Sequence, residues 1–170
     1  MKRIISLLFA VIISISFAQA QGGPIGKGGK QLNAGIGFSS WGIPIYVGMD
    51  FGVHPDISLG FEVSHRSYKD KWDKDEYTHR VWGFFGNGNY HFNRILNIPS
   101  PWDVYAGLNI GFYKWVYDSK WDDKWDASYN SGVGLGLQIG ARYYFGNLGL
   151  NLEFGGGTAS GGKFGISYKF

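Results

Sequence analysis

Eight runs of this chain alternate between apolar residues and residues that are small or polar. The runs span residues 32–39, 45–53, 57–64, 78–92, 104–112, 133–143, 148–154 and 164–170. A period of two places one kind of side chain on each face of a β-strand. No window beyond residue 31 has the 3.6-residue apolar period of a helix, and glycine interrupts most of these windows. The alternation therefore predicts an all-β chain of eight strands.

The fourth run is the least regular of the eight. Four of its aromatic residues share one face, namely Trp82, Phe84, Tyr90 and Phe92, whereas Phe85 falls on the opposite face. A β-bulge near Phe85 is one way for a strand to accommodate this pattern.

The apolar faces of these runs are too bulky to fill the inside of an eight-stranded barrel. Their side chains are mostly large, whereas side chains just fill an interior of that size. The opposite faces are rich in glycine, asparagine and serine, which suits a narrow lumen better than the coat of a soluble, lipocalin-like barrel. In hydrocarbon only a closed barrel pairs every backbone group. We therefore predict an eight-stranded antiparallel up-and-down transmembrane β-barrel with its apolar faces outward.

The first 20 residues have the pattern of an export signal. Lys2 and Arg3 precede an apolar run over residues 4–17, and small residues surround position 20. We expect a signal peptide at 1–20, a disordered Gly-rich lead-in at 21–30 and the barrel domain at 31–170. Without Lys2 and Arg3 the net charge falls from +3 to +1, so no nucleic-acid partner is expected. The absence of cysteine excludes a disulfide scaffold, a cysteine zinc site and a lipoprotein anchor.

The connections between the runs indicate an orientation. Short links at 54–56 and 146–147 alternate with long charged links at 69–77 and 118–130, and 93–101 is a longer turn on the side of the short links. Outer-membrane barrels have short periplasmic turns and long external loops, so both termini are expected in the periplasm. Aromatic residues are expected to form two interfacial girdles. The periplasmic girdle would contain Tyr90, Phe92, Tyr143, Tyr168 and Phe170, and the outer girdle Phe38, Phe112, Phe154 and Phe164.

On these features the chain resembles the small eight-stranded outer-membrane barrels of the OmpA, OmpX and opacity-protein kind, over residues 31–170. The most specific element is the C-terminal alternation of Phe164, Ile166, Tyr168 and Phe170, which resembles the insertion signal read by the outer-membrane assembly machinery. The resemblance implies the outer membrane of a Gram-negative bacterium, with the lipid bilayer and lipopolysaccharide as surroundings and a monomeric barrel. It implies no particular activity, because this fold carries several.

The lumen is the first candidate site. Its inward-facing charges are three acids and three bases, namely Asp50, Glu62, Glu153, Arg66, Arg142 and Lys169. Buried charges need partners, and a narrow lumen allows them to meet. We predict a structural charge network that plugs the barrel, and the alternative is a narrow pore or carrier for small solutes.

Two acidic and aromatic segments form the second candidate site. Residues 71–76 and 120–126 repeat one theme of Trp, Asp and Lys, and their expected contact residues are Trp72, Asp73, Asp75, Trp121, Asp122 and Trp125. These segments are either solvated hairpin extensions with Trp at the headgroup level or an adhesin-like surface for an extracellular ligand of unknown identity. Neither segment has the spacing of an EF-hand calcium loop.

The third candidate is catalytic. His65, Ser67 and Glu76 could supply the base, nucleophile and orienting carboxylate of an acyl hydrolase, similar to the lipid A deacylases of this barrel size. The surrounding residues 64–68 lack the rest of that family's pattern, so a polar interfacial triplet without catalytic residues is the preferred interpretation. His54, His79 and His91 show no metal-ligand spacing, and we expect neither a metal nor a cofactor.

Overall fold

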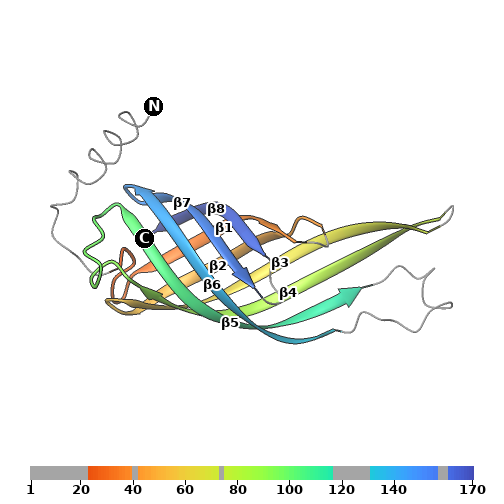
Figure 1. The fold of residues 1–170 in the computed structure, drawn as a ribbon, viewed down its shortest axis with the longest axis horizontal. Coiled ribbons are helices and arrows are strands. Elements are labelled where there is room, and N and C mark those ends of the chain that lie inside the picture. Colours follow the sequence, from red (N-terminus) through yellow and green to blue (C-terminus); the bar gives the residue numbers. More distant parts are fainter. Residues whose placement is uncertain (1–22, 40–41, 73–74, 117–130, 157–160) are drawn as a thin grey trace, which may run out of the picture.

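The computed structural model describes residues 23–39, 42–72, 75–116, 131–156 and 161–170, with the backbone alone at 70–72, 75–77 and 156. Within these residues no helix is long and apolar enough to cross a bilayer. Eight antiparallel strands follow one another around a closed barrel, as the alternation predicted (Figure 1). They are β1 Lys30–Phe38, β2 Ile45–His54, β3 Ile57–Trp72, β4 Asp75–His91, β5 Trp102–Val116, β6 Gly132–Phe145, β7 Leu148–Gly156 and β8 Gly162–Lys169.

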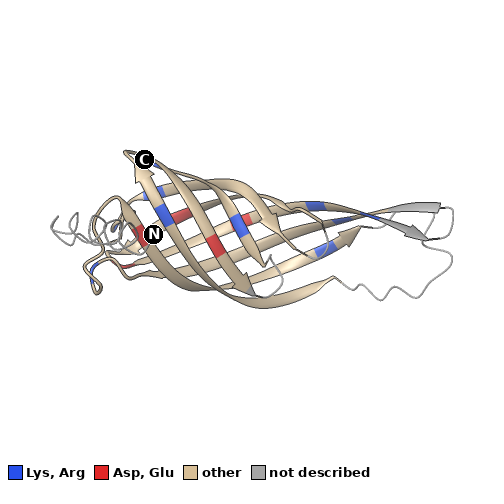
Figure 2. Ribbon diagram, turned by 45° about the horizontal axis from the view of Figure 1, so that its top comes forward, with Lys and Arg blue, Asp and Glu red and all other residues tan. Residues whose placement is uncertain are grey.

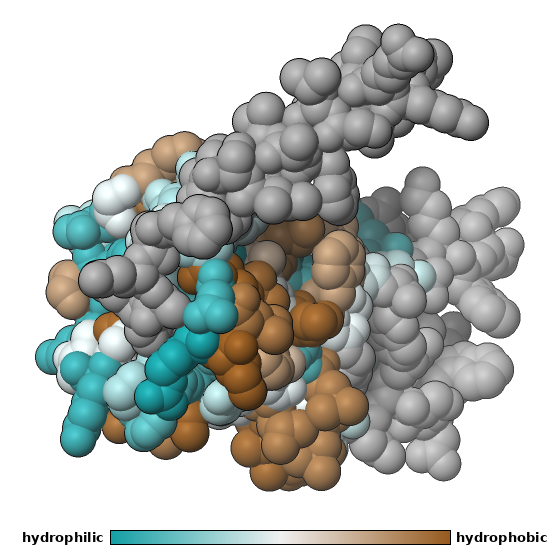
Figure 3. Space-filling model, turned by 60° about the vertical axis from the view of Figure 1, so that its left-hand side comes forward, coloured by the Kyte–Doolittle hydropathy of each residue, from teal (hydrophilic) through white to brown (hydrophobic). Residues whose placement is uncertain are grey.

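The barrel has its apolar side chains on the outside. Leu135 and Leu137 on β6 are 73% and 68% exposed, whereas the intervening residues of the strands face a polar interior. Figure 3 shows such hydrophobic side chains gathered on the outer surface, beside hydrophilic ones. The prediction of inverted polarity is thus confirmed. A surface of this kind is stable in hydrocarbon, because closure leaves no unpaired strand edge.

Aromatic residues cluster on the outside near the end of the barrel where β1 begins and β8 ends. Three edge-on pairs lie there, with ring centroids 4.8 to 5.1 Å apart, and they are Tyr90 with Phe92, Trp102 with Tyr143, and Tyr143 with Phe145. At the opposite end Phe38, Phe112 and Phe154 are exposed. The two levels have the arrangement of interfacial girdles.

The strands differ greatly in length, and this gives the barrel an uneven rim. β3 has 16 residues and β4 has 17, against 9 and 8 in β1 and β8. The β3–β4 ladder runs without interruption to the pair Trp72 and Asp75, and the resulting hairpin extends well beyond the neighbouring strands (Figure 1). The expectation of a long loop at 69–77 is therefore wrong, because backbone pairing continues through these charged residues. The link 118–130 lies outside the described residues.

The expected bulge in β4 is also absent from the described ladders. β4 pairs with β3 and β5 in continuous register, and the register shift lies between Gly52 and His54 of β2. Phe85 simply points into the barrel, where it is buried. A Cβ on Gly83 or Gly111 would collide with the Phe85 ring, so these two glycines make room for it.

The Gly-rich lead-in is ordered from residue 23 onward, which corrects the expectation of disorder there. The Gly23 N–H donates to the Pro55 carbonyl over 2.7 Å, and the Gly28 N–H donates to the Gly52 carbonyl over 2.7 Å. Ile25 is buried. The segment lies against the β2–β3 turn and borders a cavity of about 340 Å³ at this end of the barrel, next to Lys169.

Candidate functional site in the barrel lumen

Polar side chains from all eight strands meet inside the barrel. The buried polar residues come from β1 (Gln31, Asn33), β2 (Asp50), β3 (Ser58, Glu62), β4 (His79, Asn89, His91), β5 (Asp103, Asn109), β6 (Gln138, Arg142), β7 (Asn151) and β8 (Lys163, Ser167). In Figure 2 the acidic and basic residues of the strands lie as red and blue bands within the body of the barrel. These side chains reach the lumen because the strand period of two points every second residue inward.

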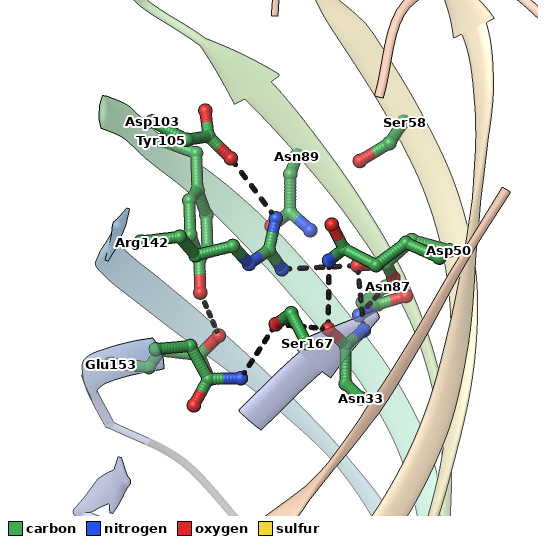
Figure 4. Close-up of polar contacts among 12 residues, drawn as sticks. Asn33, Asp50, Ser58, Asn87, Asn89, Asp103, Tyr105, Arg142, Glu153 and Ser167 are labelled. Atoms are coloured by element: carbon green, nitrogen blue, oxygen red, sulfur yellow. Dashed lines mark hydrogen bonds and ion pairs between the residues drawn. The ribbon is translucent and has the colours of Figure 1, made fainter. Parts of the chain in front are cut away.

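Arg142 lies at the centre of the first of two ionic clusters. Its guanidinium contacts Asp50 Oδ2 at 3.0 Å and Asp103 Oδ2 at 3.2 Å, and all three side chains are at most 3% exposed (Figure 4). Two amides complete the shell of Asp50, because Asn33 and Asn87 each donate to one of its oxygens. Sharing one cation between two hydrogen-bonded carboxylates reduces the large penalty of burying charge.

Asp103 connects this cluster to a histidine. His91 Nδ1 lies 2.7 Å from Asp103 Oδ1, and His91 Nε2 lies 2.9 Å from Ser58 Oγ. The order of serine, histidine and aspartate is that of a hydrolase triad. Here, however, Ser58 and Asp103 are fully buried and Asp103 is also engaged by Arg142. The arrangement therefore joins β3, β4 and β5 through side chains, and Ser58 itself has no exposed surface.

Lys163 forms the second cluster. Its Nζ lies 2.7 Å from Glu62 Oε2 and 3.1 Å from Glu153 Oε1, so one cation on β8 joins carboxylates on β3 and β7. Tyr105 links the two clusters, because its hydroxyl donates to Glu153 over 2.9 Å and its ring lies 4.1 Å below the Arg142 guanidinium carbon. The Tyr105 ring occupies the space that a side chain at position 140 would need, and that position is glycine.

Uncharged side chains extend the network around the barrel. Asn109 donates to Gln138 over 2.9 Å, and Gln138 donates to Asn89 over 2.6 Å, which connects β5, β6 and β4. Tyr46 donates to Asn151 over 3.1 Å from the other side. Each of these side chains would be costly to bury alone, and each makes at least one hydrogen bond here, although Asn89 Nδ2 and Asn109 Oδ1 have no partner among the described residues.

The predicted lumen residues thus divide into two groups. Asp50, Arg142, Glu62 and Glu153 take part in the two ionic clusters. Arg66 instead donates to Ser39 Oγ over 3.2 Å near the far rim, and the Lys169 ammonium lies 3.9 Å from the centre of the Tyr144 ring near the cavity.

Two charged members of the ionic clusters, Asp103 and Lys163, were missed from the sequence, and so was His91, which contacts Asp103. Asp103 and Lys163 each lie one residue before the start of an expected run, at 104 and 164. Extending the alternation by one residue would have placed both of them inward. His91 lies inside the fourth run with inward parity, but its side chain gives no sign in the sequence of the aspartate that it contacts.

The register does not assemble the catalytic triplet considered from the sequence. His65 and Ser67 do share the outward face of β3, but the residue opposite His65 is Trp82, whose ring centroid lies 4.5 Å from that of His65. Glu76 is paired with Lys71, and it precedes Trp82 by six residues, toward the hairpin end of β4. At about 3.3 Å per residue this separates the backbone of Glu76 from His65 by about 20 Å.

The other predicted site residues lie at the two ends of the strands. Trp72 and Asp75 pair at the end of the β3–β4 hairpin, and Asp73, Trp121, Asp122 and Trp125 lie outside the described residues. The four residues of the expected insertion signal, Phe164, Ile166, Tyr168 and Phe170, are all exposed on the outside at β8. Among the described residues no group of three histidine or acidic side chains could hold a metal ion.

Solved structures show where else this architecture occurs. Outer membrane protein OprG of Pseudomonas aeruginosa matches with a TM-score of 0.65 and 10% identity, over 89% of this chain and 99% of that chain. Neisserial surface protein A matches with a TM-score of 0.57 and 15% identity, over 84% of this chain and 96% of that chain. Ail of Yersinia pestis was solved with the heparin analogue sucrose octasulfate. It matches with a TM-score of 0.55 and 10% identity, over 85% of this chain and 99% of that chain. This chain therefore has the fold of the small outer-membrane barrels.

No protein-family model and no curated protein sequence matches the chain. At the identities above, the likeness to solved structures establishes the fold alone.

Proposed function

We propose that this protein is an integral outer-membrane barrel whose lumen is closed by its polar network and whose role is structural or surface-interactive. The apolar outer wall and the fold shared with outer-membrane barrels support the membrane location. The barrel presents the β3–β4 hairpin at the end opposite the termini, which is the external side if the short turns face the periplasm.

The proposal that the lumen is closed rests mainly on one contact. β2 and β6 are four strands apart in either direction around the ring of eight, so they stand on opposite walls. Arg142 on β6 nevertheless reaches Asp50 on β2 at 3.0 Å. A direct ion pair between opposite walls leaves no room for a hydrated ion to pass between them. Lys163 with Glu62 adds a second contact between strands that are not neighbours, β8 and β3.

Recording single-channel current in planar bilayers tests this proposal. We expect the wild type to show no stable steps, whereas a variant carrying both Arg142→Ala and Lys163→Ala conducts. The variant Lys169→Ala is the matched control, because it removes an inward lysine of β8 that makes no contact in either cluster, and it should stay silent. Steady conductance of the wild type would overturn the closed lumen and favour the narrow pore.

A surface role is the finer part of the proposal. Ail, which shares the fold, was solved with a heparin analogue, and the present chain extends a β3–β4 hairpin beyond the barrel as far as the pair Trp72 and Asp75. A screen of glycans and host-surface proteins should compare the wild type with a Trp72→Ala, Trp121→Ala, Trp125→Ala variant. Binding by the wild type that this variant loses supports a surface role, and equal binding by both proteins contradicts it.

The location itself is testable by cell fractionation. The protein should be found in the outer-membrane fraction and migrate differently on SDS gels before and after boiling, as a closed barrel resists the detergent until heated. Residues 1–20 should be missing from the purified chain. A well-folded species in aqueous buffer without detergent would contradict the proposal.

A further inference from the structure

The outer wall of the barrel carries an uneven distribution of charge. Among the side chains that the structure describes, the acidic ones are all inside the barrel or, in the case of Asp56, buried in the β2–β3 turn. The outward faces of β3, β4 and β5 carry Lys69, Arg80 and Lys114, which are exposed. Figure 2 shows blue bands on these long strands toward the end opposite the termini.

The register brings the three bases together. Arg80 pairs across the ladders with Ser67 of β3 and with Val116 of β5. Lys69 and Lys114 each lie two residues from these partners, so both are diagonal neighbours of Arg80. Diagonal neighbours on one face are about 7 to 8 Å apart, within reach of two long side chains that converge on one group.

The register also determines the height at which Arg80 and Lys114 lie above the apolar wall. Lys114 lies directly opposite Trp82, whose ring packs against His65, and the exposed rings of Phe84 and Phe112 follow below. Arg80 is two residues beyond Trp82, which is about 7 Å along the strand. Tryptophan belts lie at the boundary between hydrocarbon and headgroups. Arg80 and Lys114 therefore lie at the headgroup level of the leaflet on the side of the long hairpin.

We propose that Arg80 and Lys114, flanked by Lys69, bind a phosphate of the phosphorylated glycolipid that forms the external leaflet. Arginine pairs with phosphate through two parallel hydrogen bonds, and lysine adds a point charge. The acyl chains of the same lipid would lie along the apolar wall below Trp82. This inference rests on the proposed outer-membrane location, and it adds a specific lipid contact to it.

Native mass spectrometry of the detergent-refolded barrel tests the inference, with bisphosphorylated lipid A as the probe. We expect the wild type to retain lipid A about tenfold more tightly than its dephosphorylated form. The variant Arg80→Gln, Lys114→Gln should lose this preference. Lys30→Gln is the matched control, because Lys30 is also exposed on β1 but at the opposite end, and it should keep the preference.

Two further measurements make the result decisive. The swapped variant Arg80→Lys, Lys114→Arg conserves the charge and should retain most of the binding. Equal retention of lipid A by the wild type and the glutamine variant would overturn the proposal, as would displacement of lipid A by millimolar inorganic phosphate. Fractionation and gel migration of the same variants are read separately. A wild-type barrel that assembles in the outer membrane without a phosphate preference refutes only the lipid site, whereas a wild-type chain that fails to enter the membrane refutes the proposed function.

Discussion

Arg142 and Asp50 form an ion pair across the full width of the barrel, with Nη2 and Oδ2 3.0 Å apart and both side chains almost completely buried. β6 and β2 are on opposite walls and share no backbone hydrogen bond, so this side-chain pair connects two strands that no ladder connects. Asp103 shares the same guanidinium. The stability of the barrel should therefore depend on this one side chain.

Replacing Arg142 with methionine should destabilise the barrel by about 3 kcal/mol or more, because two buried carboxylates lose their cation. Urea unfolding in lipid vesicles, followed by tryptophan fluorescence, measures the change. Adding Asp50→Asn should recover part of the loss, since one unpaired charge is then removed, and the two changes should be strongly non-additive. Strictly additive effects would show that the pair contributes little.

Lys163 and Lys169 make a matched comparison within β8, because both have inward parity. Lys163 bridges Glu62 and Glu153, whereas the Lys169 ammonium lies over the Tyr144 ring near the open end. We expect Lys163→Met to cost about 3 kcal/mol and Lys169→Met less than about 1 kcal/mol. Equal losses in the same unfolding assay would contradict the importance of the second cluster.

Gly140 should be intolerant of even one added carbon. A Cβ there would overlap the ring of Tyr105, which is buried and held between Arg142 and Glu153, so Gly140→Ala should destabilise the barrel by about 1 to 3 kcal/mol. Gly86→Ala is the control, since its added Cβ would meet nothing closer than 3.9 Å. Unfolding midpoints in urea compare the two, and equal midpoints would contradict the packing argument.

The β3–β4 hairpin should be dispensable for closure of the barrel. Replacing residues 71–76 by Asn-Gly joins Asp70 to Tyr77, which are already partners in the ladder and of the same hydrogen-bonding type as Trp72 and Asp75, through a favoured two-residue turn. We expect the shortened chain to refold and to keep its heat-dependent migration on SDS gels. Loss of folding would mean that the extension stabilises the barrel.

Phe170 should matter for assembly in the cell more than for stability. Its ring is exposed on the outside and lies 5.9 Å from that of Tyr168, so little packing is lost on its removal. Phe170→Ser should reduce the amount of protein in the outer membrane while leaving refolding in detergent nearly unchanged. Phe145→Ser, another exposed aromatic at the same end, is the control that should assemble normally. Equal assembly of both variants would contradict an insertion signal at Phe170.

The alternation of side chains was sufficient to predict the eight strands, the inverted polarity and four members of the lumen clusters. This succeeds because a strand has a period of two, so that the parity of Asp50 or Glu62 alone decides which side it faces. It failed at the hairpin, where residues such as Lys71 and Asp75 have no apolar alternation. Pairing there is made by the backbone, which needs no pattern of side chains. The ordered conformation of residues 23–29 likewise depends on backbone hydrogen bonds to Pro55 and Gly52.

The parity of a residue within its strand decides which side of the barrel its charge faces. It does not decide the height of that charge along the barrel or the partner that lies opposite it. The closed barrel decided that Arg142 meets Asp50 and Asp103, that Lys163 meets Glu62 and Glu153, and that Arg66 and Lys169 stay apart from both clusters. The physical reason is the stagger between neighbouring strands, which accumulates around the barrel until closure brings distant residues to one level. The amino-acid sequence by itself thus determined the class of barrel and its two faces, and only the tertiary structure decided which buried charges neutralise one another.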